Sequence, residues 1–186
     1  LLGSLDQSGA PTHSYHVAIE LDRFKFLSEW YHLAILDLTF VQSFVSDAQW
    51  IAKQLGIGLA QTEIAIQRLL RLGLLEEVDG VWKKTSAKIA IETRHSEKAV
   101  REFHTQMIDK AKTALTTSEQ DFEARDITGT TMAINPDRLP EAKARIQKFR
   151  RELLSFMSEG ECSELYQLNV QFFRLTDGPL TKGTQK

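Results

Sequence analysis

The sequence has little of what several classes of protein require. Its single cysteine, Cys162, excludes an intramolecular disulfide and a cysteine-based zinc cluster, and it fits a reducing compartment such as the cytoplasm. It has no apolar run of roughly 18 residues, so we expect no membrane-spanning helix. The formal net charge is only −2, whereas a protein that coats nucleic acid without sequence preference is strongly basic. Any contact with nucleic acid must therefore be local.

Motifs of catalysis and of cofactor binding are also missing. No Ser/His/Asp or Cys/His arrangement and no motif of paired carboxylates stands out. The run Thr128-Gly129-Thr130-Thr131 lacks the glycines and the lysine of a phosphate-binding loop. His32 has no second ligand at a helical metal-binding spacing, so we interpret it as a structural histidine. We therefore expect no enzyme activity, no cofactor and no metal site.

The 186 residues suffice for one domain or two small ones, and a composition of 42% hydrophobic and 26% charged residues is typical of a folded protein. The first residue is Leu1 rather than methionine, so we expect a fragment of a longer protein. Glycine, serine, proline and threonine without sustained periodicity predict an irregular lead-in or linker over residues 1–21. A polar tail is expected over residues 178–186.

Residues 22–92 carry the pattern of a winged helix-turn-helix. Asp22 opens an amphipathic helix whose apolar stripe runs through Phe24, Leu27, Trp30, Tyr31, Ala34, Ile35 and Leu38. Asp47 is a good N-cap for a second helix, with Trp50, Ile51 and Leu55 inward, which Gly56 ends. A third helix is expected from about Ala60 to Leu72. Two strands, Leu74–Val78 and Val81–Thr85, follow and are joined by Asp79-Gly80, a strong hairpin signal. We expect Trp30 and Trp50 to be largely buried.

Residues 93–177 are predicted to form a long helix and a small β-α-β unit, which makes the fold class α+β. The long helix spans Arg94 to about Thr116. Its apolar face is either core or a seam for a partner and carries Val100, Phe103, Met107, Ala111, Ala114 and Leu115. Strands are expected over Phe122–Ile134 and over Tyr166–Phe172, where apolar and polar residues alternate. Between them, a helix that Pro136 and Pro140 open and that ends near Met157 carries these inward residues: Leu139, Ala142, Ile146, Phe149, Leu153 and Phe156.

The second helix of a helix-turn-helix can enter the major groove of DNA. On the Ala60–Leu72 helix, the buried face is expected to hold Thr62, Ala65, Ile66, Leu69 and Leu72. The opposite face offers side chains that can contact bases and phosphates. The predicted DNA contacts, with two lysines from the hairpin, are Gln67, Arg68, Arg71, Lys83 and Lys84.

Other features argue against DNA contact. Ile64 lies in the middle of the same outer face, and Glu76, Glu77 and Asp79 surround the two lysines. From Asp47 to Arg94 there are seven basic and six acidic residues, which is a weak electrostatic footprint. Two hypotheses follow: a DNA-binding transcriptional regulator, or a protein-interaction, dimerisation or regulatory module without direct DNA contact. Their partners would be DNA or a second copy of the chain.

Four segments carry a resemblance: SEWYHLAILDL (28–38), WIAKQLGI with RLLRLGLL (50–57 and 68–75), DITGTTMAI (126–134) and YQLNVQFFRLT (166–176). Together they resemble a little-characterised family of unknown function, known from Bdellovibrio-like and Fibrobacter-like bacteria. The resemblance implies transcriptional regulators with a further, repressor-type helix-turn-helix upstream, so that this chain would be the C-terminal region. Arg174 departs from the proline expected there.

Overall fold

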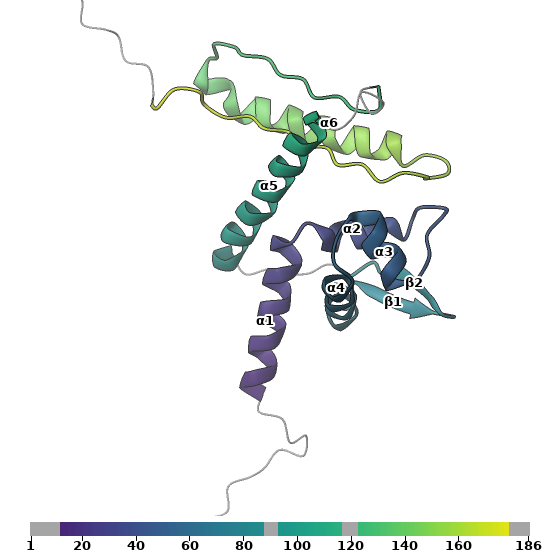
Figure 1. Cartoon of the computed structure of the whole chain (residues 1–186). Coiled ribbons are helices and arrows are strands. Elements are labelled where there is room, and N and C mark those ends of the chain that lie inside the picture. The colour runs from purple at the N-terminus through teal and green to yellow at the C-terminus, as the bar shows by residue number, and fades with distance from the viewer. Residues whose placement is uncertain (1–11, 88–92, 117–122, 179–186) are drawn as a thin grey trace, which may run out of the picture.

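The structure, a computed structural model, describes residues 12–87, 93–116 and 123–178. Its fold is α+β, mostly helical with one small two-stranded antiparallel sheet (Figure 1). The elements in chain order are α1 (Thr12–Ser28), α2 (Tyr31–Leu38), α3 (Ala48–Leu55), α4 (Leu59–Arg71), β1 (Leu75–Val78), β2 (Val81–Lys84), α5 (Thr93–Thr116), the 3-10 turn η2 (Pro136–Arg138) and α6 (Leu139–Met157). Within the described ranges, no helix is both long and apolar enough to cross a membrane.

Helices α3 and α4 begin and end close to where the sequence predicts. The carboxylate of Asp47 accepts a hydrogen bond of 2.6 Å from the backbone N–H of Trp50, which caps α3. Gly56 ends α3 with φ of 64°, a left-handed conformation that glycine adopts without steric penalty. Only three residues separate α3 from α4. The predicted pair of helices joined by a glycine turn is therefore confirmed.

The predicted hairpin is also confirmed, although each strand is one residue shorter than expected. Asp79 and Gly80 both have positive φ, 53° and 76°, as a tight two-residue turn between twisted strands requires. Glu76 lies opposite Lys83 in the antiparallel register, as predicted. The hairpin is held to the helices by the backbone N–H of Trp82, which donates 2.9 Å to the hydroxyl of Ser46.

The N-terminal helix differs from the prediction in two ways. It begins at Thr12, so residues 12–21 of the expected lead-in are helical and not irregular; residues 1–11 lie outside the described ranges. The helix expected from Asp22 to Leu38 is also broken into α1 and α2. At the break, Gln106 of α5 accepts a hydrogen bond from the backbone N–H of Trp30 (3.3 Å) and donates one to the carbonyl of Ser28 (2.8 Å). A side chain 76 residues away thus satisfies backbone groups that a continuous helix would pair internally.

One apolar core lies among α1, α2, α3, α4 and β1. Its fully buried centre includes Ile35, Ile51, Ala65 and Leu69, each about 0% exposed. Trp30 and Trp50 pack against this core but are only half-buried, so the expectation that both are largely buried holds only in part. After the break at residues 29–30, Tyr31, Ile35 and Leu38 of the expected stripe are buried as predicted. Before the break, Phe26 is buried, whereas Phe24 is only half-buried.

Helix α5 packs along α1 and is the main connection to the C-terminal residues. Ala99 and Met107 are buried on its inner face, and the ammonium of Lys110 lies 3.4 Å from the centroid of the Trp30 ring. The face predicted for this helix is thus partly core. Val100 and Leu115 from the same predicted set are 42% and 56% exposed.

The predicted β-α-β unit does not form within the single chain. Helix α6 is present as predicted, but residues 123–134 and 166–172 contain no strand, and Phe122 lies outside the described ranges. Both segments run as extended chain on either side of α6 (Figure 1). They are joined by a side chain, since the Tyr166 hydroxyl donates to the carbonyl of Ala124 over 3.1 Å. Without backbone pairing between them, neither segment qualifies as a strand.

The core makes a stability prediction. Ile51→Ala should lower the free energy of unfolding by roughly 2–5 kcal/mol, because the side chain is fully buried and its removal leaves a cavity. Ile64→Ala is the matched control: Ile64 is 56% exposed, and we expect a change within about 0.5 kcal/mol. Urea denaturation followed by circular dichroism measures both. Equal losses for the two variants would contradict the assigned core.

Candidate nucleic-acid interface

The two faces of α4 are those that the sequence predicts. Thr62, Ala65, Ile66 and Leu69 are buried, while Leu72 is half-buried at the helix end. The outer face carries Ala60, Glu63, Ile64 and Gln67, all exposed. Thus the structure places Gln67 on the outer surface of α4, with the apolar Ile64 one turn before it.

Arg68 and Arg71 of α4 are both bound to one carboxylate on α1. Arg68 Nε donates to Asp22 Oδ1 over 2.9 Å, while Arg71 Nε donates to Oδ2 over 2.9 Å and Arg71 Nη2 donates to Oδ1 over 3.1 Å. The side chains of Asp22 and Arg68 are only 9% and 12% exposed, whereas that of Arg71 is 51% exposed. Arg68 and Arg71, two of the five predicted DNA contacts, therefore form ion pairs with Asp22 of the same chain.

His32 of α2 completes this cluster, which we call the Asp22 network (Asp22, His32, Arg68 and Arg71). Arg68 Nη1 lies 3.1 Å from His32 Nε2. A guanidinium can only donate, so Nε2 accepts, and the proton resides on Nδ1, which lies 3.2 Å from the carbonyl of Glu29. Burial lowers the pKa of His32 to about 4, and the positive charge of Arg68 acts in the same direction. The interpretation of His32 as a structural histidine agrees with this geometry.

Asp22 is kept ionised by its two arginines. Burial by itself raises the pKa of this carboxyl group, but the hydrogen bonds from Arg71 and Arg68, together with their charges, outweigh it and leave the pKa below the usual 3.8. The network therefore contains one negative and two positive charges near neutral pH. Removing Asp22 would leave the buried guanidinium of Arg68 without its counter-charge.

The two lysines of the hairpin differ in their surroundings. Lys84 Nζ lies 2.7 Å from the Asp37 carboxylate of α2 and 5.4 Å from the centroid of the Phe40 ring. Lys83 is exposed, opposite Glu76 on β1, and makes no ion pair within 4 Å among the described residues. The structure thus brings Arg68 and Arg71 together at α1, places Lys84 against α2, and leaves Gln67 and Lys83 on separate exposed surfaces.

Sequence reasoning missed the role of Asp22, which it treated only as the first residue of a helix. Asp22 and Phe26 are four residues apart, hence on one face of a helix, and the structure shows both to be buried. The predicted apolar stripe ran through Phe24 and omitted Phe26, so nothing in it marked Asp22 as a buried acidic residue that requires a cationic partner. The sequence could not identify that partner, because Arg68 and Arg71 lie 46 and 49 residues further along the chain.

Among the described residues, no group of three or more histidine, cysteine, aspartate or glutamate side chains is placed to hold a metal ion. The fold and this surface define a mostly helical α+β domain in which an ionic network joins three helices. By sequence, the chain belongs to the family of domains of unknown function DUF4423, whose model matches residues 10–175. That span includes almost all of the four segments that carry the resemblance to an uncharacterised family. No curated protein and no solved structure matches the chain.

The Asp22 network predicts a specific loss of stability in acid. Because the pKa of His32 falls from 6.5 to about 4 on folding, the unfolded chain binds more protons between these two pH values, and stability decreases as pH falls through this window. For this fully buried histidine, the free energy of unfolding decreases by on the order of 3 kcal/mol across the whole window. The pKa of Asp22 is below 3.8 in the fold. The stability that its ionised carboxylate contributes is therefore lost only below about pH 3.8.

His32→Gln keeps an acceptor for Arg68 and removes the titration. Urea denaturation at pH 7 and pH 4.5 should show a smaller loss of stability in this variant than in the wild-type chain. His104→Gln, at an exposed position of α5, serves as the control and should retain the wild-type loss. An unchanged pH dependence in His32→Gln would contradict the assignment of His32 as the buried neutral histidine.

Proposed function

We propose that this chain is a protein-interaction module of a transcriptional regulator, built on a winged helix-turn-helix that does not itself read DNA bases. Helices α3 and α4 with the hairpin β1–β2, residues 48–84, have the order and spacing of such a motif. Two contacts support this: the backbone N–H of Trp82 donates a hydrogen bond to the hydroxyl of Ser46, and Lys84 forms an ion pair with Asp37. The hairpin is thereby held against the helices as a wing.

The observation that carries the proposal is the state of the arginines on α4. Base reading requires guanidinium groups free to bind guanine or phosphate. Here Asp22 binds both Arg68 and Arg71. If Arg68 turned toward DNA, the buried carboxylate of Asp22 would lose one of its two cationic partners. The side chain at the centre of the outer face, Ile64, offers only an apolar contact. These features favour a scaffold over a DNA-reading surface.

The role in a regulator rests on the resemblance described above. It implies bacterial proteins with a repressor-type helix-turn-helix upstream of this domain. In such a protein, base reading would belong to the upstream motif, and the present domain would join or regulate copies of it. A cytoplasmic location and the absence of catalysis are part of the same proposal.

Direct DNA binding is the second candidate, and one observation favours it. Gln67 and Lys83 are exposed and take no part in an ion pair among the described residues. Arg71 also retains a 51% exposed side chain, which can reach a phosphate while bound to Asp22. This candidate requires the three side chains to contact one duplex.

A DNA titration separates the two candidates. Titrated with mixed-sequence duplex at low salt, the chain should bind more weakly than about 10⁻⁴ M, the weak end of ordinary non-specific binding. Fluorescence anisotropy of a labelled duplex measures this affinity. Micromolar binding that weakens steeply with salt, and further on Lys83→Ala, would overturn the proposal in favour of direct DNA contact.

Variants extend the test to the arginines. Arg71→Ala should lower the free energy of unfolding by about 1 kcal/mol, a value reduced for the exposure of the side chain, because it removes two hydrogen bonds to Asp22. Lys53→Ala, an exposed lysine of α3 without an ion pair in the described structure, is the control and should leave stability unchanged. An Arg71 that contacts DNA would in addition weaken duplex binding in this variant, an effect that the proposal does not expect.

A further inference from the structure

The C-terminal residues are unusual because none of them is buried. From 123 to 178, every described residue is exposed or half-buried. Five aromatic side chains are conspicuous: Phe149, Phe156, Tyr166, Phe172 and Phe173, at 41–71% exposure. Nine large aliphatic side chains of the same region are also more than a third exposed. A segment that orders itself without burying apolar surface gains little free energy to offset its lost conformational entropy.

The exposed apolar area matches what a stable dimer buries. A large aromatic side chain buries about 150–250 Å², so the five aromatic residues alone expose on the order of 600 Å² at their observed exposures. A standard specific interface buries about 800 Å² on each partner, and the aliphatic residues supply the difference. This many exposed large apolar side chains within residues 123–178 is unusual for a monomer.

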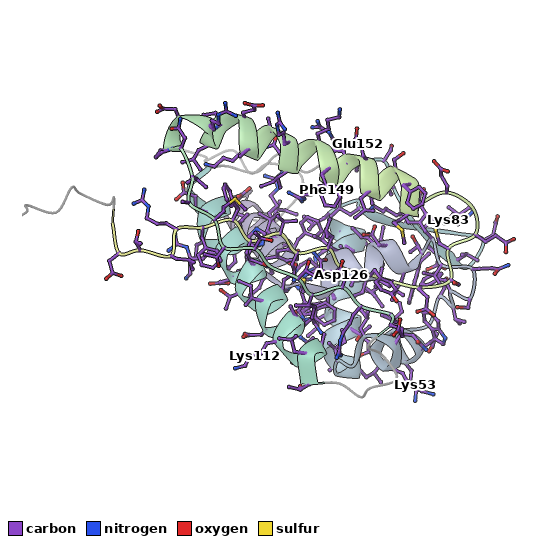
Figure 2. All side chains as sticks on the ribbon, turned by 90° about the horizontal axis from the view of Figure 1, so that it is seen from above. Lys53, Lys83, Lys112, Asp126, Phe149 and Glu152 are labelled. Carbon is purple, nitrogen blue, oxygen red and sulfur yellow. The ribbon has the colours of Figure 1, made fainter. Side chains whose placement is uncertain are left out.

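The apolar residues lie along one side of α6 and along one face of the extended segment beside it. On α6 they recur at alternating spacings of three and four, through Leu139, Ala142, Ile146, Phe149, Leu153 and Phe156. The segment 166–172 alternates apolar and polar residues and runs beside the helix. A hollow of about 230 Å³, lined by Ile146, Val170 and Phe172 among others, remains between them. Figure 2 shows Phe149 on the side of α6 that faces the extended segments.

The backbone of these segments is not paired with any other backbone in the described structure, and one carbonyl, that of Leu168, accepts from the side chain of Gln167. Among the described residues, no backbone–backbone hydrogen bond involves residues 126–134 or 166–172. An extended segment with free N–H and C=O groups is a template for pairing with another chain. If residues 166–172 pair antiparallel with the same residues of a second copy, across a two-fold axis normal to the sheet, the apolar faces of both copies lie on one side. Each α6 could then cover this joint face.

Charge complementarity favours a second copy over an unrelated partner. On α6, Lys143, Arg150 and Arg151 make no ion pair in the described structure, whereas Arg145 and Lys148 do. The segment after α6 carries three carboxylates that are likewise without an ion pair there: Glu159, Glu161 and Glu164. In the pairing described above, Glu164 of one copy lies opposite Arg174 of the other, just beyond the Phe172 that lies beside Lys143 of that copy, so that opposite charges meet twice.

We infer that residues 123–178 complete their fold by docking on the same residues of a second copy of this chain, with α6 and the segment 166–172 in the interface. This inference rests on the proposed function, because it names the partner of the interaction module. The surface is separate from α4 and the hairpin, so its failure can be distinguished from that of the proposal.

The test is the mass of the full chain in solution. Light scattering at tens of micromolar should give twice the 21.1 kDa of one chain. Phe172→Asp places a charge in the inferred interface and should halve that mass. Ile64→Asp is the matched control, since Ile64 is 56% exposed on α4 of the winged core, and it should leave the dimer intact.

A second measurement serves if Phe172→Asp fails to fold. Hydrogen exchange of the wild-type chain should show slow exchange for the amides of residues 166–172, and this protection should be lost on dilution to the monomer. A monomeric mass at tens of micromolar, or a dimer that Ile64→Asp abolishes and Phe172→Asp does not, would overturn the inference. A monomer that also fails to bind DNA overturns the inference alone, whereas salt-sensitive DNA binding overturns the proposed function whatever the mass.

Discussion

The arrangement of the N-terminal helices depends on one carboxylate, that of Asp22, which binds two arginines of α4. Arg68 in turn donates to His32, so the same network joins α1, α2 and α4. The network is well satisfied: both Asp22 oxygens accept, and both ring nitrogens of His32 are within hydrogen-bond distance of a partner. Removing one member would therefore leave a buried polar or charged group without its partner.

The same ion pairs decide how the surface of α4 should be interpreted. From the sequence, Arg68 and Arg71 appear on the outer side of an amphipathic helix, where a recognition helix carries its base contacts. In the fold, α1 lies against α4 and supplies the counter-charge, so the local positive charge is largely neutralised. Residue type and helix face were predictable here. Whether the arginine side chains are free to contact DNA was not predictable, because it depends on an acidic residue more than 40 positions earlier.

Local chemistry explains which parts of the fold could be predicted. Asp47, Gly56 and the pair Asp79-Gly80 act within a few residues of themselves, as an N-cap, a C-cap and a turn, and the structure agrees at all of them. The break between α1 and α2 had no such signal, because the group that satisfies it, Gln106, comes from α5. The helical pattern of residues 22–38 is continuous in sequence, and only the distant amide explains why the helix stops.

The C-terminal segments illustrate a different limit. Alternation of apolar and polar residues reports that one face of an extended segment will be buried, and it does not say whether the covering chain is the same molecule. In residues 166–172 the alternation is present and the chain is extended, yet no backbone group pairs with another backbone group within the described structure. The prediction of a strand was therefore wrong for the single chain. The apolar face and the backbone of this segment nevertheless still require a covering partner. A second copy meets that demand with the fewest assumptions, because it brings the same alternation, the same backbone edge that no other backbone pairs with, and opposite charges at the ends of the paired segments.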